Sequence, residues 1–135
     1  MSSNSTLVGK VGRDPELRYS NSGVATCRFS VAVNRRKKAG EEWIEKTTWY
    51  DVTSFSELAE NCAESLSKGD EVIIEGYVEE PRTYEKKDGT TGVSLPFIAN
   101  NLGVSLRWGM AKAVRGERPA KKSAPAPRIV NEEPF

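Results

Sequence analysis

The chain has 135 residues, with 20 Lys+Arg, 19 Asp+Glu and a formal net charge of +1, so we expect one domain and no global basic field. Two cysteines and no histidine argue against a metal site and remove the commonest general base, and no cofactor is expected. No apolar run is long enough for a signal peptide or a membrane span, which predicts a soluble, cytoplasmic protein.

Three strands are predicted in the first half of the chain. Residues 6–12 form a short strand with glycines, and a turn follows at 21–23. Residues 24–33, "VATCRFSVAV", alternate between apolar and polar side chains, as a half-buried strand does. The third strand is "TTWYDVTSF" (47–55), which is rich in β-branched and aromatic residues.

After residue 55 the spacing of apolar residues changes from every second to every fourth position. Leu58, Cys62 and Leu66 recur every four residues, which predicts an amphipathic helix of about three turns. Ser54 or Ser56 is expected to cap its start, and Gly69 to cap its C-terminal end. Both cysteines of the chain are expected to be small buried residues.

Two more strands complete the pattern. Residues 71–80 predict a fourth strand, 86–92 a hairpin tip, and 93–108 a fifth strand that is broken near Pro96 or Asn100. One helix between strands 3 and 4 of five is the layout of an OB barrel. The predicted fold class is therefore all-β: a five-stranded OB-fold barrel with one α-helix between strands 3 and 4, and a disordered C-terminal tail.

The last part of the chain differs in composition. Residues 1–110 carry 14 Lys+Arg and 16 Asp+Glu, whereas residues 111–135 carry 6 and 3, a local charge of +3. The stretch "RGERPAKKSAPAPR" has no apolar periodicity and nothing to bury. We expect a binding domain over 1–110 and a disordered tail over 111–135.

Cations and aromatic residues occur together in two stretches. One is "NRRKKAGEEWIEK" (34–46), predicted as a connection between strands, and the other is "PRTYEKKDG" (81–89). A single such cation would be read as a solvated loop charge, and a single aromatic as a core residue. The combination indicates single-stranded nucleic acid, because each unpaired base stacks on a ring and each phosphate attracts a cation. The predicted nucleic-acid-binding residues are Arg28, Arg35, Arg36, Lys37, Lys38, Trp43, Trp49, Phe55, Arg82, Tyr84, Lys86 and Lys87.

The stretches "LVGKVGRDPELRYSNSG", "FSVAVNRR", "LAENCAESLSKGDEVIIEGYV" and "SLRW" resemble bacterial single-stranded-DNA-binding proteins, with actinobacterial or phage members nearest in pattern. The resemblance covers residues 5–108. It implies an OB-fold homotetramer that binds single-stranded DNA in replication, recombination and repair, without catalytic residues. It also implies that Trp49, Phe55 and Tyr84 are stacking aromatics. The family often has a further tryptophan where this chain has "NRRKK", and whether Trp43 compensates is left open.

The ending "NEEPF" continues the resemblance, because family members end in a flexible linker and an acidic tip that closes with Pro-Phe. Glu132, Glu133, Pro134 and Phe135 are therefore expected to bind partner proteins. The ring would enter an apolar pocket, and the terminal carboxylate would meet a basic group there. This tip has only two acids, and its linker is short and basic.

Three alternatives to a single-stranded-DNA binder were weighed. An OB-fold RNA-binding module is not separated from it by stacking physics, only by the family resemblance. An enzyme is not expected, because the chain shows no nucleophile with a base, and "GKVGRD" lacks the spacing of a phosphate-binding loop. The third is an interaction protein that uses the barrel only as a scaffold. If the chain binds single-stranded DNA, we expect a cytoplasmic, nucleoid-associated protein.

Overall fold

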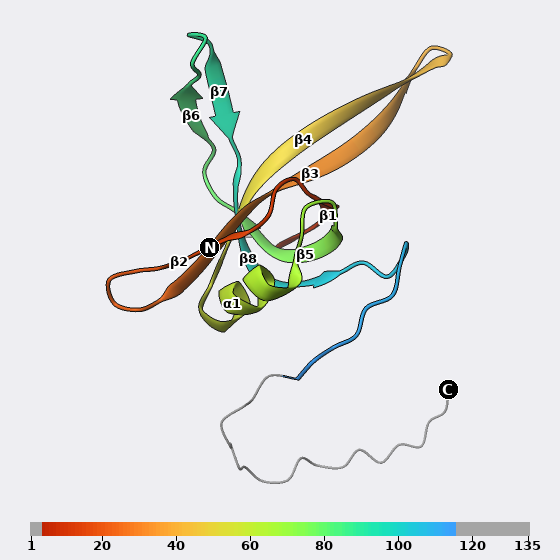
Figure 1. The fold of residues 1–135 in the computed structure, drawn as a ribbon. Coiled ribbons are helices and arrows are strands. Elements are labelled where there is room, and N and C mark those ends of the chain that lie inside the picture. Colours follow the sequence, from red (N-terminus) through yellow and green to blue (C-terminus); the bar gives the residue numbers. More distant parts are fainter. Residues whose placement is uncertain (1–3, 116–135) are drawn as a thin grey trace.

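The computed structural model describes residues 4–115, which form a small closed barrel from which β-hairpins project (Figure 1). The predictions for the tail beyond residue 115 lie outside the described residues. The elements in chain order are β1 (Ser5–Val11), β2 (Glu16–Tyr19), β3 (Ala25–Ala39), β4 (Glu42–Phe55), α1 (Ser56–Ser65), β5 (Glu71–Val78), β6 (Arg82–Glu85), β7 (Thr91–Ser94) and β8 (Pro96–Val104).

Closure of the barrel depends on one extra strand pairing. The main sheet runs in the order β1-β5-β8-β4-β3-β2, and β1 also pairs with β3, so that β1, β5, β8, β4 and β3 close into a barrel. All of these neighbours are antiparallel except β4 and β8, which pair in parallel over three residues. This is a five-stranded OB-fold barrel, as the sequence predicts.

The barrel interior is filled by one apolar cluster. Alternate residues of β3 point inward, and Cys27, Phe29 and Val31 are almost fully buried. Phe97 of β8 is also fully buried, and Tyr50 meets it edge-on with ring centroids 6.2 Å apart. Such a closed, densely packed interior leaves the outer face of β3 and β4 free to carry function.

Helix α1 lies beneath the barrel and packs against β3 and β4 through its apolar face (Figure 1). It follows the strand that ends at Phe55, as predicted, but that strand is β4 rather than the third strand because the prediction missed β2. The expected serine caps are wrong. Ser54 is buried in the strand with its hydroxyl 3.5 Å from the Cys27 carbonyl, Ser56 has a φ of 60°, and Phe55 occupies the N-cap position without a side-chain hydrogen bond.

The C-terminal end of the helix also differs from the prediction. The helix closes at Leu66, whose N–H donates to the Cys62 carbonyl, so the expected glycine cap comes too late. Gly69 lies in the turn that follows, with φ of 95°, and its N–H donates to the Val11 carbonyl. In the same region the Lys68 N–H donates to Asp14 at 2.9 Å. This bond ties the "GRDPELRY" stretch to the "SLSKGD" stretch, two halves of the resemblance noted above.

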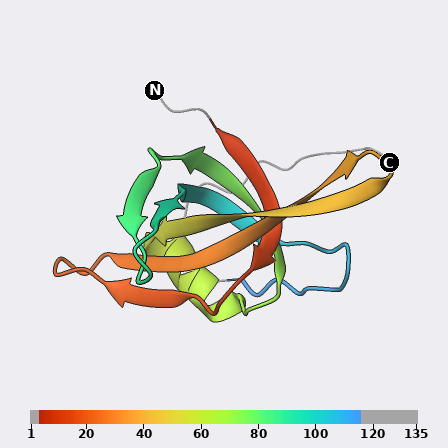
Figure 2. The same ribbon diagram turned by 90° about the horizontal axis from the view of Figure 1, so that it is seen from above.

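The prediction of a connection over 34–46 is wrong. These residues continue β3 and β4 in unbroken antiparallel register to Ala39 and Glu42, and the chain reverses at Gly40, whose φ is 69°. The run of charged residues made this stretch look like a loop. In the structure Arg36 lies directly opposite Glu45 on the neighbouring strand, and such a pair of opposite charges stabilises strand pairing. We call the part of this hairpin outside the barrel, residues 34–47, the arm; Figure 2 shows it extending far beyond the barrel.

Two other elements differ in detail. The short strand β2 was missed because its residues are almost all exposed and show no apolar alternation; it adds to the edge of β3. The fifth predicted strand is divided into β7 and β8 around Leu95, close to the expected break. β7 pairs with β6 in a separate two-stranded hairpin that projects from the barrel beside the arm (Figure 1).

Candidate nucleic-acid interface

The register of the β3–β4 pair decides which predicted residues share a face. Directly paired residues of antiparallel strands point to the same side, and alternate residues point to opposite sides. Because the odd-numbered residues of β3 fill the barrel interior, its even-numbered residues and their partners on β4 form the outer face. That outer face includes Phe55, Trp49 and Trp43, together with Arg28, Arg36 and Lys38.

We call Phe55, Trp49 and Trp43 the aromatic stripe. They follow one another at intervals of six residues along β4, and each is about half exposed: 46%, 54% and 59%. At about 3.3 Å per strand residue, neighbouring rings are about 20 Å apart along the strand. The stripe therefore presents separate aromatic surfaces along one line rather than one cluster.

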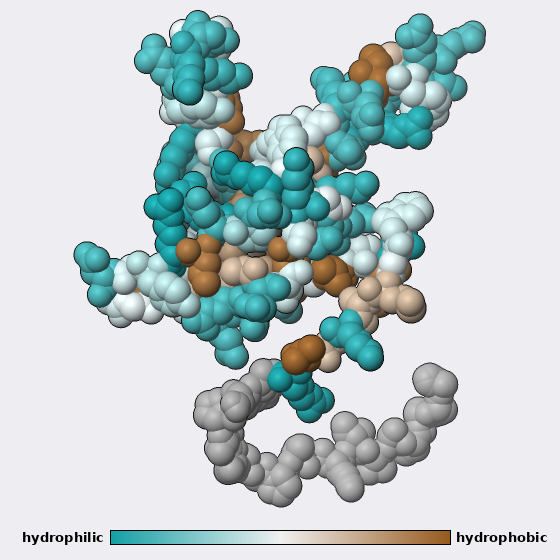
Figure 3. Space-filling view, in the orientation of Figure 1, coloured by the Kyte–Doolittle hydropathy of each residue, from teal (hydrophilic) through white to brown (hydrophobic). Residues whose placement is uncertain are grey.

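The four consecutive cations of the arm do not form one patch. Arg36 and Lys38 lie on the outer face with Trp43, whereas Arg35 and Lys37 lie on the opposite face. All four side chains are exposed, and Figure 3 shows the arm as mainly hydrophilic. The sequence shows that four cations are present, but only the strand register shows which of them lie on the same face as the aromatic stripe.

Trp43 sits between two of these cations near the end of the arm. The Arg36 guanidinium carbon lies 5.4 Å from the centroid of the Trp43 ring, and the Lys38 ammonium nitrogen lies 5.9 Å from it. Cations at this distance are attracted to the ring face and help hold the ring in place. The sequence placed Trp43 on a loop; in the structure it is a strand residue with a fixed facing direction.

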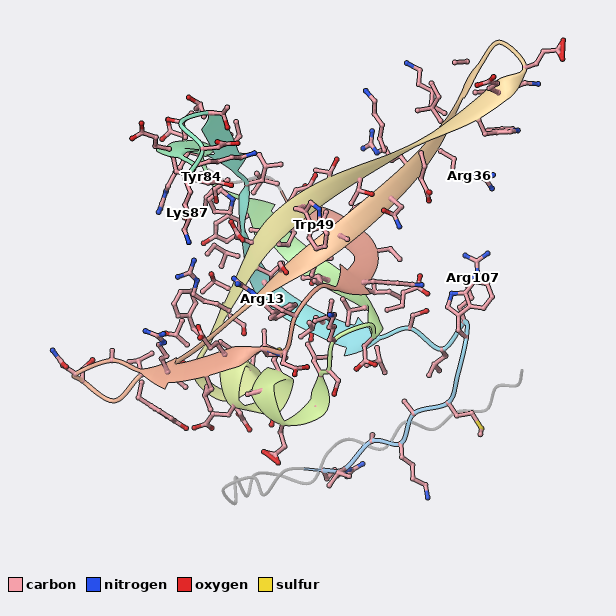
Figure 4. All side chains as sticks on the ribbon, turned by 45° about the horizontal axis from the view of Figure 1, so that its top comes forward. Arg13, Arg36, Trp49, Tyr84, Lys87 and Arg107 are labelled. Carbon is pink, nitrogen blue, oxygen red and sulfur yellow. The ribbon has the colours of Figure 1, made fainter. Side chains whose placement is uncertain are left out.

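Arg13 is a candidate residue that the sequence analysis missed. It is exposed and directly follows Gly12, which lies beneath the Trp49 ring. In the view of Figure 4, Trp49 lies at the middle of the β3–β4 ribbon and Arg13 lies below it, nearer to β2. Only its neighbourhood in the "GKVGRD" stretch could have drawn attention to it, since the contact of Gly12 with Trp49 is not local in sequence. Its guanidinium adds a cation near the central ring of the stripe.

The β6–β7 hairpin carries the second predicted set. Tyr84 is 51% exposed and pairs with Gly92, while Arg82, two residues earlier, shares its face. Lys86 and Lys87 are at the hairpin tip, as predicted, and Figure 4 shows Lys87 below Tyr84. The hairpin therefore repeats the combination of an exposed ring and nearby cations.

The turn of this hairpin is well ordered by hydrogen bonds. The Thr90 N–H and hydroxyl both donate to the Asp88 carboxylate, at 3.0 and 2.6 Å, and they lower the pKa of Asp88. The Lys86 N–H donates to the Thr90 carbonyl at 2.8 Å. These bonds fix the backbone of the turn from which the two lysines project.

One hydrogen bond links the β6–β7 hairpin to the face of β4 that carries the aromatic stripe. The Ser94 hydroxyl, at the end of β7, donates to the Asp51 carboxylate at 2.6 Å. Asp51 lies two residues from Trp49 and on the same face of β4. The base of the β6–β7 hairpin is thereby anchored next to the centre of the aromatic stripe, and Figure 4 shows Trp49 between Tyr84 and Arg36.

A second exposed cation–aromatic pair lies outside this face. Beyond β8, the Arg107 guanidinium carbon is 5.2 Å from the centroid of the Trp108 ring, which is 73% exposed. Figure 4 shows Arg107 well away from Trp49. In the sequence, this segment stands out only through the stretch "SLRW" of the family resemblance.

The cysteines are structural, as expected. Both are free and buried, and burial raises the pKa of Cys27 to about 11 and also raises that of Cys62. Within residues 4–115 no three His, Cys, Asp or Glu side chains come together as metal ligands. Nor does the described part of the chain contain a helix long and apolar enough to span a membrane. Glu132, Glu133, Pro134 and Phe135 lie outside the described residues.

Comparison with known proteins decides the family. Residues 3–105 match the model of the "Single-strand binding protein family". The chain belongs to this family. Its resemblance to bacterial members, actinobacterial ones included, is confirmed.

Among its relatives in the family, the "Single-stranded DNA-binding protein" of Treponema pallidum (strain Nichols) is 36% identical over 111 residues, covering 82% of this chain and 63% of that protein. The protein of the same name from Mycobacterium bovis (strain ATCC BAA-935 / AF2122/97) is 34% identical over 128 residues, covering 90% of this chain and 77% of that one. The chain thus spans less than two thirds of the Treponema protein.

A solved structure agrees with the fold. The crystal structure of the small single-stranded DNA-binding protein from Streptomyces coelicolor matches with a TM-score of 0.66 and 29% identity. The match covers 78% of this chain and 95% of that one. That protein therefore shares the barrel fold described here.

Proposed function

We propose that this chain binds single-stranded DNA, without strong sequence preference, across the outer face of β3 and β4 and the adjoining β6–β7 hairpin. The observation that carries this proposal is the aromatic stripe, three half-exposed rings in line on one face with cations beside them. A ring exposed on one face accepts an unpaired base, and stacking contributes about 1–3 kcal/mol per base. Duplex DNA is a poorer ligand because its bases are already stacked on one another.

Each predicted residue has a role in this proposal. Bases stack on the stripe and on Tyr84. Phosphates are attracted by the cations on the same surfaces, which are Arg28, Arg36, Lys38, Arg82, Lys86 and Lys87, with Arg13 added by the structure. Arg35 and Lys37 face away from the stripe and contribute by long-range attraction or where the strand wraps around the arm.

The wider role rests on family membership. We propose that residues 1–110 act as a non-catalytic DNA-binding domain in replication, recombination and repair in the cytoplasm, at the nucleoid. In this proposal residues 111–135 form a tail whose tip, Glu132 to Phe135, recruits partner proteins. The relatives' printed names support the DNA-binding part of this proposal.

Assembly as a homotetramer is proposed on the same ground. An exposed apolar pair supports this proposal. On the outer face of β1 and β5, Val8 and Ile73 pair directly and are 48% and 44% exposed. Apolar side chains exposed side by side favour burial against another copy. Sedimentation velocity on the full chain measures the state directly, and a monomer at micromolar concentration contradicts it.

The test of the function is a comparison of three ligands. Labelled dT oligomers, the same oligomers annealed to dA, and matched U oligomers are titrated with the full chain at two salt concentrations. We expect the dT single strand to bind most tightly and its affinity to fall with salt. Equal or tighter RNA binding would favour the RNA-binding alternative, and absence of binding to any strand would favour the scaffold alternative.

A further inference from the structure

Two rings of the proposed interface rest on glycines, one directly after β1 and one in β7. A Cβ added to Gly12 would meet Cζ3 of the Trp49 ring, with Cη2 3.0 Å and the Ser30 hydroxyl 2.7 Å away. A Cβ added to Gly92 would lie 2.5 Å from Cζ of Tyr84 and 2.8 Å from its hydroxyl oxygen. In both cases the far end of the aromatic side chain occupies the space that any other residue would fill.

Backbone conformation does not explain why these positions are glycine. Four glycines in the described chain have positive φ, and neither Gly12 nor Gly92 is among them. Gly92 is also buried although its neighbours Thr91 and Val93 are exposed, so its cover is the Tyr84 ring that pairs with it across the hairpin. What these positions require is the absence of a side chain.

The backbone beneath each ring is held in place by hydrogen bonds. The Gly12 N–H donates to the Ser30 carbonyl at 2.8 Å, and the preceding Val11 N–H donates to the Asp70 backbone carbonyl at 2.9 Å. The β6–β7 hairpin is closed at its tip by the Asp88–Thr90 bonds described above. A methyl group at either glycine would therefore displace the side chains that occupy its space, which are the ring in both cases, with Ser30 at Gly12 and Lys86 at Gly92.

A ring whose far end rests on a glycine is held on one side and leaves the rest of its surface open. The exposed fractions of 54% for Trp49 and 51% for Tyr84 fit this arrangement. A ring already held in this way loses less rotational freedom when a base stacks on it, which is preorganisation for binding. A ring displaced from its glycine would have to be ordered at the moment of binding.

We propose that Gly12 and Gly92 are positioning residues, which seat Trp49 and Tyr84 against the sheet so that one face of each ring is presented to a base. This inference rests on the proposed function for its consequence in binding, but the seating itself is a property of the free protein. Gly103 of β8 provides a matched control, because it is exposed, lacks positive φ, and has no atom within 4 Å of an added Cβ. Because Gly103 pairs with Ile73 on the face proposed for assembly, sedimentation velocity of all three glycine variants is compared with that of the unchanged chain.

The experiment compares Gly12→Ala, Gly92→Ala and Gly103→Ala in the full chain. Each of the first two is expected to weaken dT-oligomer binding about 2- to 12-fold, the equivalent of ordering one side chain on binding. Gly103→Ala is expected to bind like the unchanged chain. Gly92→Ala keeps the test valid if Gly12→Ala fails to fold, because Gly92 lies in a hairpin outside the barrel.

A double variant separates positioning from general damage. If Gly12 acts through Trp49, then Gly12→Ala in the Trp49→Ala background causes no further loss of affinity. Losses that add, or a Gly12→Ala variant that binds as tightly as Gly103→Ala, would overturn the inference.

The free protein gives a readout that does not depend on DNA. In a chain whose other tryptophans are replaced by phenylalanine, Gly12→Ala is expected to increase quenching of Trp49 emission by acrylamide, because the ring leaves its seat. Unchanged quenching would overturn the seating even if DNA binding fell. Increased quenching in a chain that binds no DNA would support the seating and refute only the proposed function.

Discussion

Replacement of Trp43 by alanine tests whether the arm takes part in binding. Trp43 is 59% exposed and flanked by Arg36 and Lys38, at 5.4 and 5.9 Å from its ring centroid. Loss of one stacked base at about 1–3 kcal/mol corresponds to an affinity about 5- to 150-fold weaker. The ring is not part of the core, so the free energy of unfolding should change by less than about 1 kcal/mol.

The spacing of the stripe extends this prediction to a double variant. Trp43 and Trp49 are about 20 Å apart along β4, too far to share one base. Their free-energy losses should therefore add to within about 0.5 kcal/mol in the double alanine variant. Ile44→Ala is the control, because Ile44 is exposed to a similar degree on the opposite face of the arm.

The assay is anisotropy of a labelled dT oligomer long enough to cover the arm and the barrel. The reasoning would be refuted if Trp43→Ala bound no more weakly than Ile44→Ala. It would also be refuted if the losses at Trp43 and Trp49 were far from additive, since the two rings would then act as one site rather than as separate platforms.

Three further predictions concern charge, stability and the thiols. Arg36→Gln should make the slope of log affinity against log salt shallower by about 1, as expected for one lost phosphate contact; an unchanged slope excludes that contact. Asp14→Ala should lower the free energy of unfolding in urea by about 1 kcal/mol through loss of the Lys68 N–H bond and leave DNA affinity intact; an unchanged midpoint would show that the bond is dispensable. Burial raises the pKa of Cys27 from 9.0 to about 11, so neither Cys27 nor Cys62 should react with iodoacetamide at pH 8 until the chain is unfolded, whereas rapid native labelling contradicts their burial.

The raised pKa values of the two cysteines predict that the free energy of unfolding falls at high pH. Because the folded chain holds the Cys27 proton more tightly than the unfolded chain, this contribution is complete below pH 9 and is lost as pH rises towards 11. Cys27→Ala should remove that part of the pH dependence. The Cys62 pKa is raised as well, so some of the decline should remain in the variant.

The extent to which the fold could be predicted follows from burial. The half of β3 inside the barrel has one buried and one exposed face, and its alternation marks a strand clearly. The arm has no buried face, so its residues show no alternation and the strand pairing beyond Asn34 leaves no apolar signal. β2 was missed for the same reason, since only Leu17 among its residues is even partly buried.

The candidate site could be predicted in composition but not in arrangement. The sequence identifies exposed aromatics and cations, yet it cannot assign Arg36 to the stripe and Arg35 to the other face without the register with β4. Contacts between distant strands were also out of reach. Gly12 beneath Trp49 joins residues 37 positions apart, and only coordinates bring them together.

The most direct measurement follows the emission of Trp49 alone. The chain has three tryptophans, so Trp43→Phe with Trp108→Phe leaves Trp49 as the only reporter and keeps an aromatic ring at position 43. Adding a dT oligomer should quench this emission, with an end point that coincides with saturation of the anisotropy of the same oligomer. Anisotropy that saturates while Trp49 emission stays constant would show that DNA binds elsewhere, and the account of this face would be wrong.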